Sequence, residues 1–389
     1  MNIINEYEGM KPAGAGRLAA LDAFRGLAIM LMILVNTPGS YEHVYVQLEH
    51  SAWLGCTIAD LAFPFFVFSA GAAGYFSCQR QGGELTGPVG KKLLRRTAVL
   101  FFLGILYNMF PFYDVTLGFS TEGIVQWWAH VRVCGVLQRI ALGYGLGMLL
   151  CLWLKDAWRI AGAAAALLAI HSLGFFLYAP AAPFVLQHNL SLAVDLIVPG
   201  EVHLYQGFGL PFDPEGFYGV LSTTAHVLCG YLAGRWASRQ SLRQVPLRPL
   251  AVAGAAAVLA ALLLNFAVPI CKALWTASYV LLASGLAALL LAAAIYVWET
   301  GEHRAVFYPF RVFGMNAIFC YFAAAYINLS LSLPWFIIDD MPVYDWIYQQ
   351  VFLPFFPPKA ASLAFGICFL ALCWGLAELL YRRRIFLKV

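Results

Sequence analysis

Apolar runs of about twenty residues, separated by short charged or turn-forming segments, recur along the 389-residue chain. A run of that length crosses the hydrocarbon core of a bilayer as an α-helix. We therefore predict an all-α, polytopic transmembrane helix bundle of about ten helices, in which 334–358 forms a re-entrant or amphipathic loop or an eleventh short span. The predicted helices cover 18–38, 56–77, 93–112, 133–154, 157–178, 216–236, 250–269, 274–298, 305–328 and 361–381.

The composition supports the same class of protein. Hydrophobic residues make up 62% of the chain, charged residues 11%, and the mean hydropathy is +0.75, which excludes an ordinary soluble globule. No internal repeat or linker divides the sequence, so we expect one membrane domain over 1–389. The small net charge of +4 and the dispersed basic residues argue against a nucleic-acid partner. Cys and His spacings typical of a metal site are absent from the sequence.

The distribution of Lys and Arg predicts the orientation in the membrane. Of the 24 Lys and Arg residues, 18 fall on one side of the predicted membrane and three on the other. The remaining three, Arg25, Arg139 and Arg311, fall within predicted helices. Because the side rich in positive charge faces the cytoplasm, both termini, with a short tail over 1–17, are expected there. The loop between the first two helices then faces the outside.

That loop and its flanks carry polar residues that a plain membrane hairpin would not keep. Asn36 ends the first predicted helix, His50 lies in the loop, and Asp60 lies one turn inside the second helix. Burying such groups without partners costs several kcal/mol each. Antiparallel pairing of the two helices brings all three residues to one membrane face. We take them as the candidate active site.

Each of these residues has a chemical and a structural interpretation. A neutral imidazole at His50 suits a general base or an acyl-accepting nucleophile, whereas an interfacial histidine would simply bond a loop carbonyl. Asp60 could orient that imidazole or meet a cation, or be a charge stabilised by the helix N-terminus. The Asn36 amide could donate to a developing oxyanion, or cap its helix.

The arginines within helices point to an anionic cofactor. Arg25 and Arg311 lie at the cytoplasmic ends of their predicted helices, where guanidinium groups can bind phosphates. The structural alternative is an interaction with lipid headgroups. We assign Arg139 to cofactor binding as well, with an ion pair to Asp60 as its alternative.

Four further residues are expected in the outer half of the membrane, near His50. Asp213 and Glu215 precede the sixth predicted helix, and Lys272 and Trp275 lie at the turn before the eighth. Together they predict a polar chamber open to the outside that binds the substrate. Taken alone, Lys272 could equally be an interfacial cation.

Seven segments in this order resemble the heparan-alpha-glucosaminide N-acetyltransferase family of membrane acyltransferases: LDAFRG, MILVNTPG, HSAWLGCTIADLAFPFFVF, GVLQRIALGY, FDPEG, KALWTASYVL and FGMNA. The resemblance covers 21–317, most of the chain. It implies transfer of acetyl from cytoplasmic acetyl-CoA to the amine of a glucosamine-type sugar on the far side of the membrane. The motif histidine falls on His50, the motif asparagine on Asn36 and the motif aspartate on Asp60.

The resemblance also sets expectations about context. It implies a bacterial inner-membrane enzyme, dependent on acetyl-CoA and no metal, whose acceptor is an amino sugar or a cell-envelope glycan. A homodimer is left open. The competing hypothesis is a transporter of sugars or glycan precursors, which would use a polar chamber equally well.

The predicted orientation can be tested by labelling single cysteines from outside the cell. A cysteine placed at Gln47 or Gln187 should react with a membrane-impermeant maleimide, and one at Gln81 should react only after permeabilisation. The opposite pattern would invert the orientation and remove His50 from the outer face.

Overall fold

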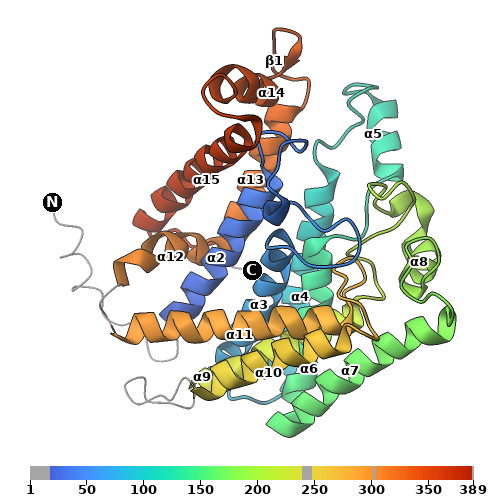
Figure 1. The fold of residues 1–389 in the computed structure, drawn as a ribbon, viewed down its shortest axis with the longest axis vertical. Coiled ribbons are helices and arrows are strands. Elements are labelled where there is room, and N and C mark those ends of the chain that lie inside the picture. The colour runs from blue at the N-terminus through green and yellow to red at the C-terminus, as the bar shows by residue number, and fades with distance from the viewer. Residues whose placement is uncertain (1–17, 239–247, 301–303, 388–389) are drawn as a thin grey trace.

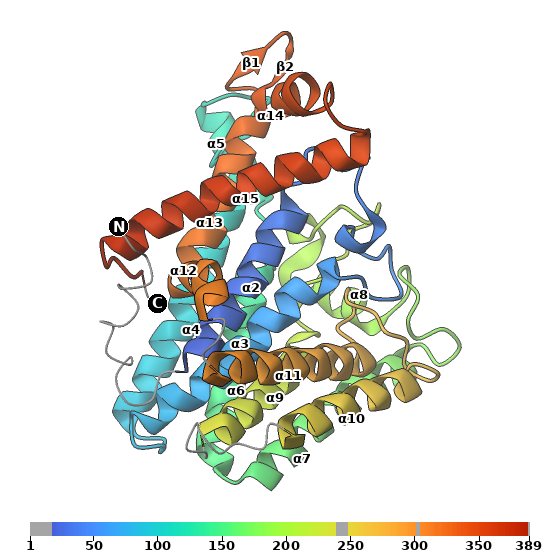
Figure 2. The same cartoon turned by 60° about the vertical axis from the view of Figure 1, so that its left-hand side comes forward.

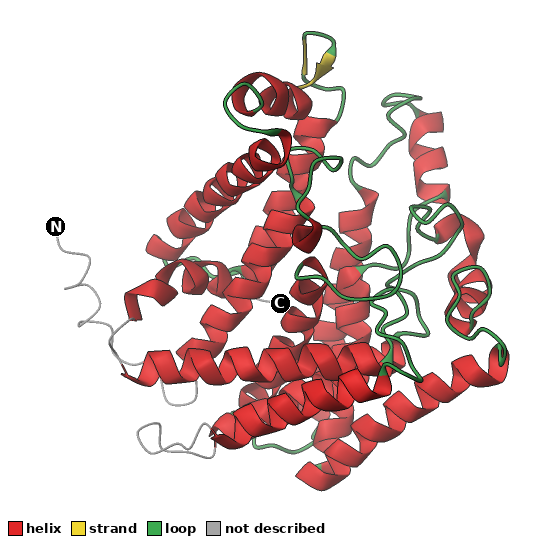
Figure 3. Cartoon of the chain, viewed as in Figure 1, coloured by secondary structure: helices red, strands yellow, loops and turns green. Residues whose placement is uncertain are grey.

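The computed structural model describes residues 18–238, 248–300 and 304–387, and the predicted tail 1–17 lies outside them. These residues form helices joined by long loops, with one two-stranded hairpin, as Figure 3 shows. An all-α fold is therefore confirmed. In the first half of the chain the helical elements include α2 (Ala19–Asn36), η1 (Val46–Leu48), η2 (Ala59–Leu61), α3 (Ala62–Gln79), α4 (Gly87–Met109), α5 (Thr121–Ala129), α6 (Val136–Leu154), α7 (Ala157–Tyr178) and α8 (Leu190–Asp195). In the second half they include α9 (Val220–Ser238), α10 (Arg248–Leu264), α11 (Ala277–Thr300), α12 (Tyr308–Met315), α13 (Ala317–Ser332) and α15 (Pro358–Arg382).

Six of these helices are long and apolar enough to cross a membrane, and the pair α12 and α13 raises the number to seven if it counts as one broken span. The protein is thus a multi-pass membrane protein, but the predicted count of ten membrane helices is not confirmed. Three predicted spans correspond to helices that fall short of these criteria. The first half of α4 carries four cations, α9 is interrupted by polar residues, and α10 has only 17 residues.

One predicted helix differs from the structure, and the predicted loop region that follows it contains no spanning helix. The helix predicted over 305–328 is bent by 76° between α12 and α13. Asn316 lies buried at this break, where its side chain bonds the Ile385 carbonyl and the Leu387 N–H, so the C-terminal segment pairs with the buried amide at the bend. The region 334–358 contains the hairpin of β1 (Ile337–Ile338) and β2 (Met341–Pro342) and the short helix α14 (Val343–Ile347), and it forms no helix long enough to span.

The helix pairs that position the site pack closely at glycines. Figures 1 and 2 show α10 and α11 side by side, with α2 and α3 beside them and the hairpin protruding at one end. A Cβ at Gly26 of α2 would lie 1.6 Å from the Phe310 carbonyl oxygen, and one at Gly314 of α12 would lie 1.9 Å from the Asp22 carbonyl oxygen. Such backbone contact is how membrane helices associate through small residues.

The α2–α12 contact predicts the effect of a single methyl group. Gly26→Ala should destabilise the protein by roughly 1–3 kcal/mol, because the added carbon has no space. Gly162→Ala in α7 is the matched control, since a Cβ there meets nothing within 4 Å and alanine favours a helix. Thermal unfolding in detergent measures both. Equal melting temperatures for the two variants would contradict the packing described.

Candidate active site

Asp60 is the centre of the site. It lies in η2, directly before α3, and its side chain is 0% exposed. One carboxylate oxygen, Oδ1, lies 2.9 Å from His50 Nδ1 and 3.3 Å from the Lys272 ammonium. The other, Oδ2, accepts hydrogen bonds from the backbone N–H groups of Ser51 and Thr57 and from the Thr57 hydroxyl. A buried carboxylate with this many donors stays ionised.

The carboxylate fixes the tautomer of His50. An ionised carboxylate only accepts hydrogen bonds, so His50 Nδ1 must carry the proton that points at Asp60, and Nε2 is left as the basic nitrogen. The His50 side chain is 45% exposed, which leaves Nε2 accessible to a substrate. Lys272 Nζ is 3.1 Å from Nδ1 and 3.5 Å from Nε2. Because Nδ1 already donates a hydrogen bond to Asp60, it cannot accept one from Lys272. We therefore assign the Lys272 ammonium as an ion-pair partner of Asp60. The result is a buried anion that orients an imidazole beside a fixed positive charge.

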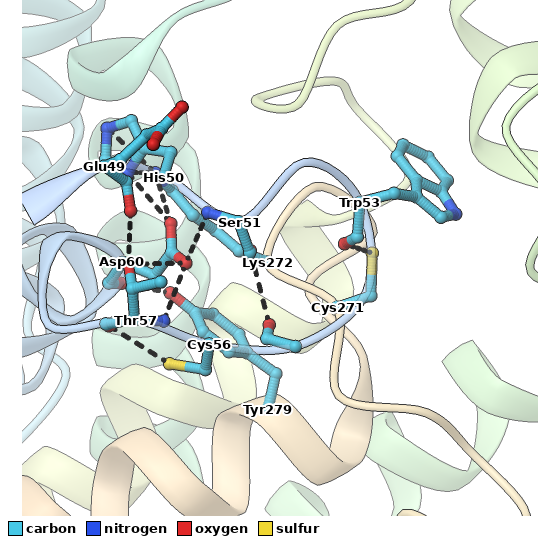
Figure 4. A network of polar contacts seen from close by, with 11 residues as sticks. Glu49, His50, Ser51, Trp53, Cys56, Thr57, Asp60, Cys271, Lys272 and Tyr279 are labelled. Carbon is cyan, nitrogen blue, oxygen red and sulfur yellow. Dashed lines mark hydrogen bonds and ion pairs between the residues drawn. The ribbon is translucent and has the colours of Figure 1, made fainter. Parts of the chain in front are cut away.

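Two chain segments hold these groups together, as Figure 4 shows. The loop before α3 pairs with the connection between α10 and α11 through Gly55 N–H, which donates to the Ile270 carbonyl at 2.7 Å, and through the Cys271 thiol, which donates to the Trp53 carbonyl at 3.2 Å. Gly55 has φ of +105°, a conformation that favours glycine. From α11, the Tyr279 hydroxyl donates to the Asp60 backbone carbonyl at 2.6 Å. Lys272 is thereby held against Asp60.

Two cysteines close to Asp60 are weaker candidates for a nucleophile than His50. Burial, together with the Asp60 charge, raises the pKa of Cys56 to about 12, although Lys272 opposes this shift. Burial also raises the pKa of Cys271 to about 12. Since the thiolate is the nucleophilic form, both groups remain inactive thiols near neutral pH. The geometry therefore favours the imidazole.

A second polar cluster is built around Arg132. Its guanidinium bonds both carboxylate oxygens of Asp213 at 2.7 and 2.8 Å and the Glu215 carboxylate at 2.5 Å. It also lies 5.0 Å from the ring centroid of Tyr205. Burial acts against the charge, but the two carboxylates raise the pKa of Arg132 above its usual value. Arg132 is one of the three cations that the charge distribution places on the side predicted to face outside, and the sequence gives it no further role. The acidic pair in FDPEG was the available signal for a basic partner.

Arg139 also binds the FDPEG loop, through its backbone. It is 1% exposed, and it donates to the carbonyls of Pro214 and Gly216 at 2.8 and 2.7 Å. In the described part of the chain it does not pair with Asp60, so that predicted alternative is wrong. Its role in cofactor binding stays a prediction.

The remaining predicted residues lie in different surroundings. Trp275 is 1% exposed and packs against Phe63 and Tyr279, and Asp213 is fully buried, so neither presents a surface to substrate in this structure. Asn36 is exposed at the end of α2, and its side chain forms no hydrogen bond to any residue that the structure describes. Its role stays a prediction.

The two other predicted cofactor residues are separate from the Asp60 cluster. Arg25 Nη1 lies 3.9 Å from Asp22 Oδ1. The Arg311 guanidinium lies 5.2 Å from the Trp298 ring centroid, and its Nε is buried without a described partner. Both therefore belong to surroundings different from those of His50.

The fold and the site define a multi-pass membrane protein in which a buried carboxylate orients a histidine within a cluster of loop residues. Residues 17–262, more than half of the chain, match the sequence model of the family "Heparan-alpha-glucosaminide N-acetyltransferase, catalytic". The chain belongs to this family. The matched part contains His50, Asp60 and Arg132, whereas Lys272, Trp275 and Arg311 lie beyond it.

Two curated relatives are similar over nearly the whole chain. The heparan-alpha-glucosaminide N-acetyltransferase of Mus musculus is 26% identical over 435 residues, covering 97% of this chain and 61% of the relative. The protein of the same name from Homo sapiens is 26% identical over 430 residues, covering 96% and 60%. The chain thus spans about 60% of the length of these relatives.

The buried Asp195, next to the FDPEG loop, predicts a pH dependence of stability. Its Oδ1 accepts from Phe217 N–H at 2.8 Å, and its Oδ2 is buried without a described partner. Burial raises the pKa of Asp195 to about 7; Asp213 acts in the same direction, and the Phe217 hydrogen bond and Arg139 oppose it. The folded state therefore holds this proton more tightly than the unfolded chain does, whose aspartates titrate near pH 4. This contribution to stability is present below about pH 4 and is lost as pH rises towards and through about 7.

Between pH 4 and 7 the Asp195 proton should make the free energy of unfolding fall with rising pH, by at most about 1.4 kcal/mol per pH unit. Asp195→Asn should remove this pH dependence. Asp340→Asn, an exposed position, serves as the control and should keep it. Identical profiles for wild type and Asp195→Asn would show that Asp195 is ionised throughout.

Proposed function

We propose that this protein transfers an acetyl group from acetyl-CoA to the amine of a glucosamine-type sugar, across the inner membrane of a bacterium. The observation that carries the proposal is the contact of the buried Asp60 carboxylate with His50 Nδ1, which leaves Nε2 basic and accessible. Family membership supports acetyl transfer over a transporter, which has no need of an oriented base. The bias of Lys and Arg supports cytoplasmic termini and an outer position for His50.

His50 Nε2 takes a proton from the acceptor amine as the amine nitrogen bonds to the thioester carbonyl carbon. The carbon–sulfur bond then breaks, and His50 returns the proton to the leaving thiolate. In the alternative route Nε2 itself bonds to the carbonyl carbon as the carbon–sulfur bond breaks, and CoA leaves as its thiolate. The amine nitrogen then bonds to the same carbon and displaces the imidazole, and the proton that the amine loses passes to the thiolate. Asp60 keeps the imidazole in the required tautomer in each.

Lys272 has a part in either route because its ammonium lies 3.5 Å from His50 Nε2. A positive charge there stabilises negative charge that develops on the carbonyl oxygen. It also disfavours a second ammonium group beside His50, so the acceptor is favoured as the neutral, nucleophilic amine. We propose Lys272 for this electrostatic role, and Glu215 with Arg132 for contacts to the sugar.

Buried polar groups that lack partners support a path for the donor through the bundle. Both ring nitrogens of His226 and the indole N–H of Trp275 are buried without a described partner, and their ring centroids are 6.0 Å apart. Tyr279 connects these two groups to the active site: its ring packs on Trp275, and its hydroxyl donates to the Asp60 backbone carbonyl. Groups left unpaired in hydrocarbon are costly, and an amide-containing chain such as the pantetheine arm of CoA would satisfy them. CoA itself supplies the activated acetyl thioester.

Replacing His50 tests the chemical step. His50→Ala should reduce acetyl transfer to glucosamine by about 10²- to 10⁴-fold, the usual effect of removing a general base, while folding and donor binding persist. His130→Ala, at an exposed histidine next to α5, is the matched control and should retain activity. Product formation from labelled acetyl-CoA measures both. Substantial transfer by His50→Ala would refute the assignment.

The same assay separates the two routes when the acceptor is omitted. Label retained on His50 after peptide digestion indicates the covalent route, and its absence in an active enzyme indicates direct transfer. Asp60→Asn should lower the rate without abolishing donor binding, because an amide does not select the Nδ1–H tautomer.

A further inference from the structure

A small pocket lies at the opposite end of α3 from Asp60. Ser77 and Asp60 are 17 positions apart, about 25 Å along a helix. The pocket is formed between the end of α3, the first turns of α4 and the second half of α6. Its lining contains two cations and no carboxylate, and consists of Ser77, Cys78, Gln81, Val89, Lys92, Leu93, Arg96, Tyr144, Met148 and Leu152.

The cations are placed to bind an anion. Arg96 donates from Nη1 to the Tyr144 hydroxyl at 2.8 Å, and its guanidinium carbon lies 4.6 Å from that ring's centroid. Its Nε is buried and has no described partner, so one N–H of a charged group is left for a ligand. Lys92, one turn earlier, is exposed. The nearby Glu84 does not neutralise these cations, because it is paired with Lys155 at 2.9 Å.

Other walls of the pocket are apolar, from Val89, Leu93, Met148 and Leu152. An apolar wall next to an arginine and a lysine suits a ligand that joins a flat ring to phosphate groups. Arg311 is placed elsewhere, against Trp298 of α11.

We infer that Lys92 and Arg96 bind the phosphate groups at the nucleotide end of CoA. The inference rests on the proposed function, because it names the site of that donor. In this arrangement α3 extends from the active site to the phosphate site: Asp60 lies just before its start, and the pocket with Lys92 and Arg96 lies beside its end. The same phosphate chemistry occurs in anionic lipid headgroups, so the test must separate the two sources.

The test is the affinity of the full-length, detergent-purified protein for CoA. Lys92→Gln and Arg96→Gln should each raise the Kd for CoA about tenfold or more, the loss expected for one charge-assisted hydrogen bond. The affinity for pantetheine, which has no phosphate, should not change. Lys91→Gln and Arg95→Gln are matched controls, because these exposed cations flank the pocket residues on α4 but do not line the pocket. Lys92 is exposed, so its variant should fold even if Arg96→Gln does not.

Several outcomes would overturn the inference. Wild-type affinity in folded Lys92→Gln and Arg96→Gln proteins would do so, as would equal weakening by the two control variants. Loss of copurified anionic phospholipid from the pocket variants, with CoA affinity unchanged, would assign the pocket to lipid instead. A wild-type protein that binds no CoA at all would refute the proposed function itself, which distinguishes the two failures.

Discussion

The ionised carboxylate of Asp60, buried at the start of α3, is the constraint on which the site depends. An unpaired charge there would cost several kcal/mol, so the surrounding chain must supply donors. It does so from the loop that carries His50 and from Lys272, more than two hundred residues later in the sequence. The geometry of one imidazole thereby depends on two distant segments of the chain, 50–60 and the turn that carries Lys272. Stability and chemistry at this position rest on the same contacts.

At the FDPEG loop the buried charges are positive, and the surrounding chain must supply acceptors instead of donors. Two guanidinium groups, those of Arg132 and Arg139, bond carboxylates and backbone carbonyls of that single loop, and the Nε of Arg139 is buried without a described partner. A polar loop can remain ordered next to the membrane only when its backbone groups have such partners. The preorganised loop then presents Glu215 and Arg132 without rearrangement.

The proposed transfer across the membrane would impose a requirement on length. A donor that enters from the cytoplasm, as proposed, would be held at one end by its charged part and presented at the other by its reactive part. The helix α3 meets this requirement, because Asp60 lies at its start and the pocket containing Lys92 and Arg96 lies beside its end. The unpaired buried groups of His226 and Trp275 lie between hydrophobic helices, where an extended polar chain would be stabilised.

The sequence alone determined the helical class and the approximate positions of the main helices, and it placed His50 and Asp60 at one membrane face, because apolar run length and the cost of buried charge act locally. It left open whether Asp60 meets the imidazole, a cation or a helix N-terminus. It failed at the bend next to Asn316, since that break is satisfied by residues about seventy positions away. Only the tertiary structure placed Lys272 on Asp60, Arg132 on Asp213 and Arg139 on the FDPEG backbone. These partners are chosen by helix packing, which brings remote segments together and which no local pattern records.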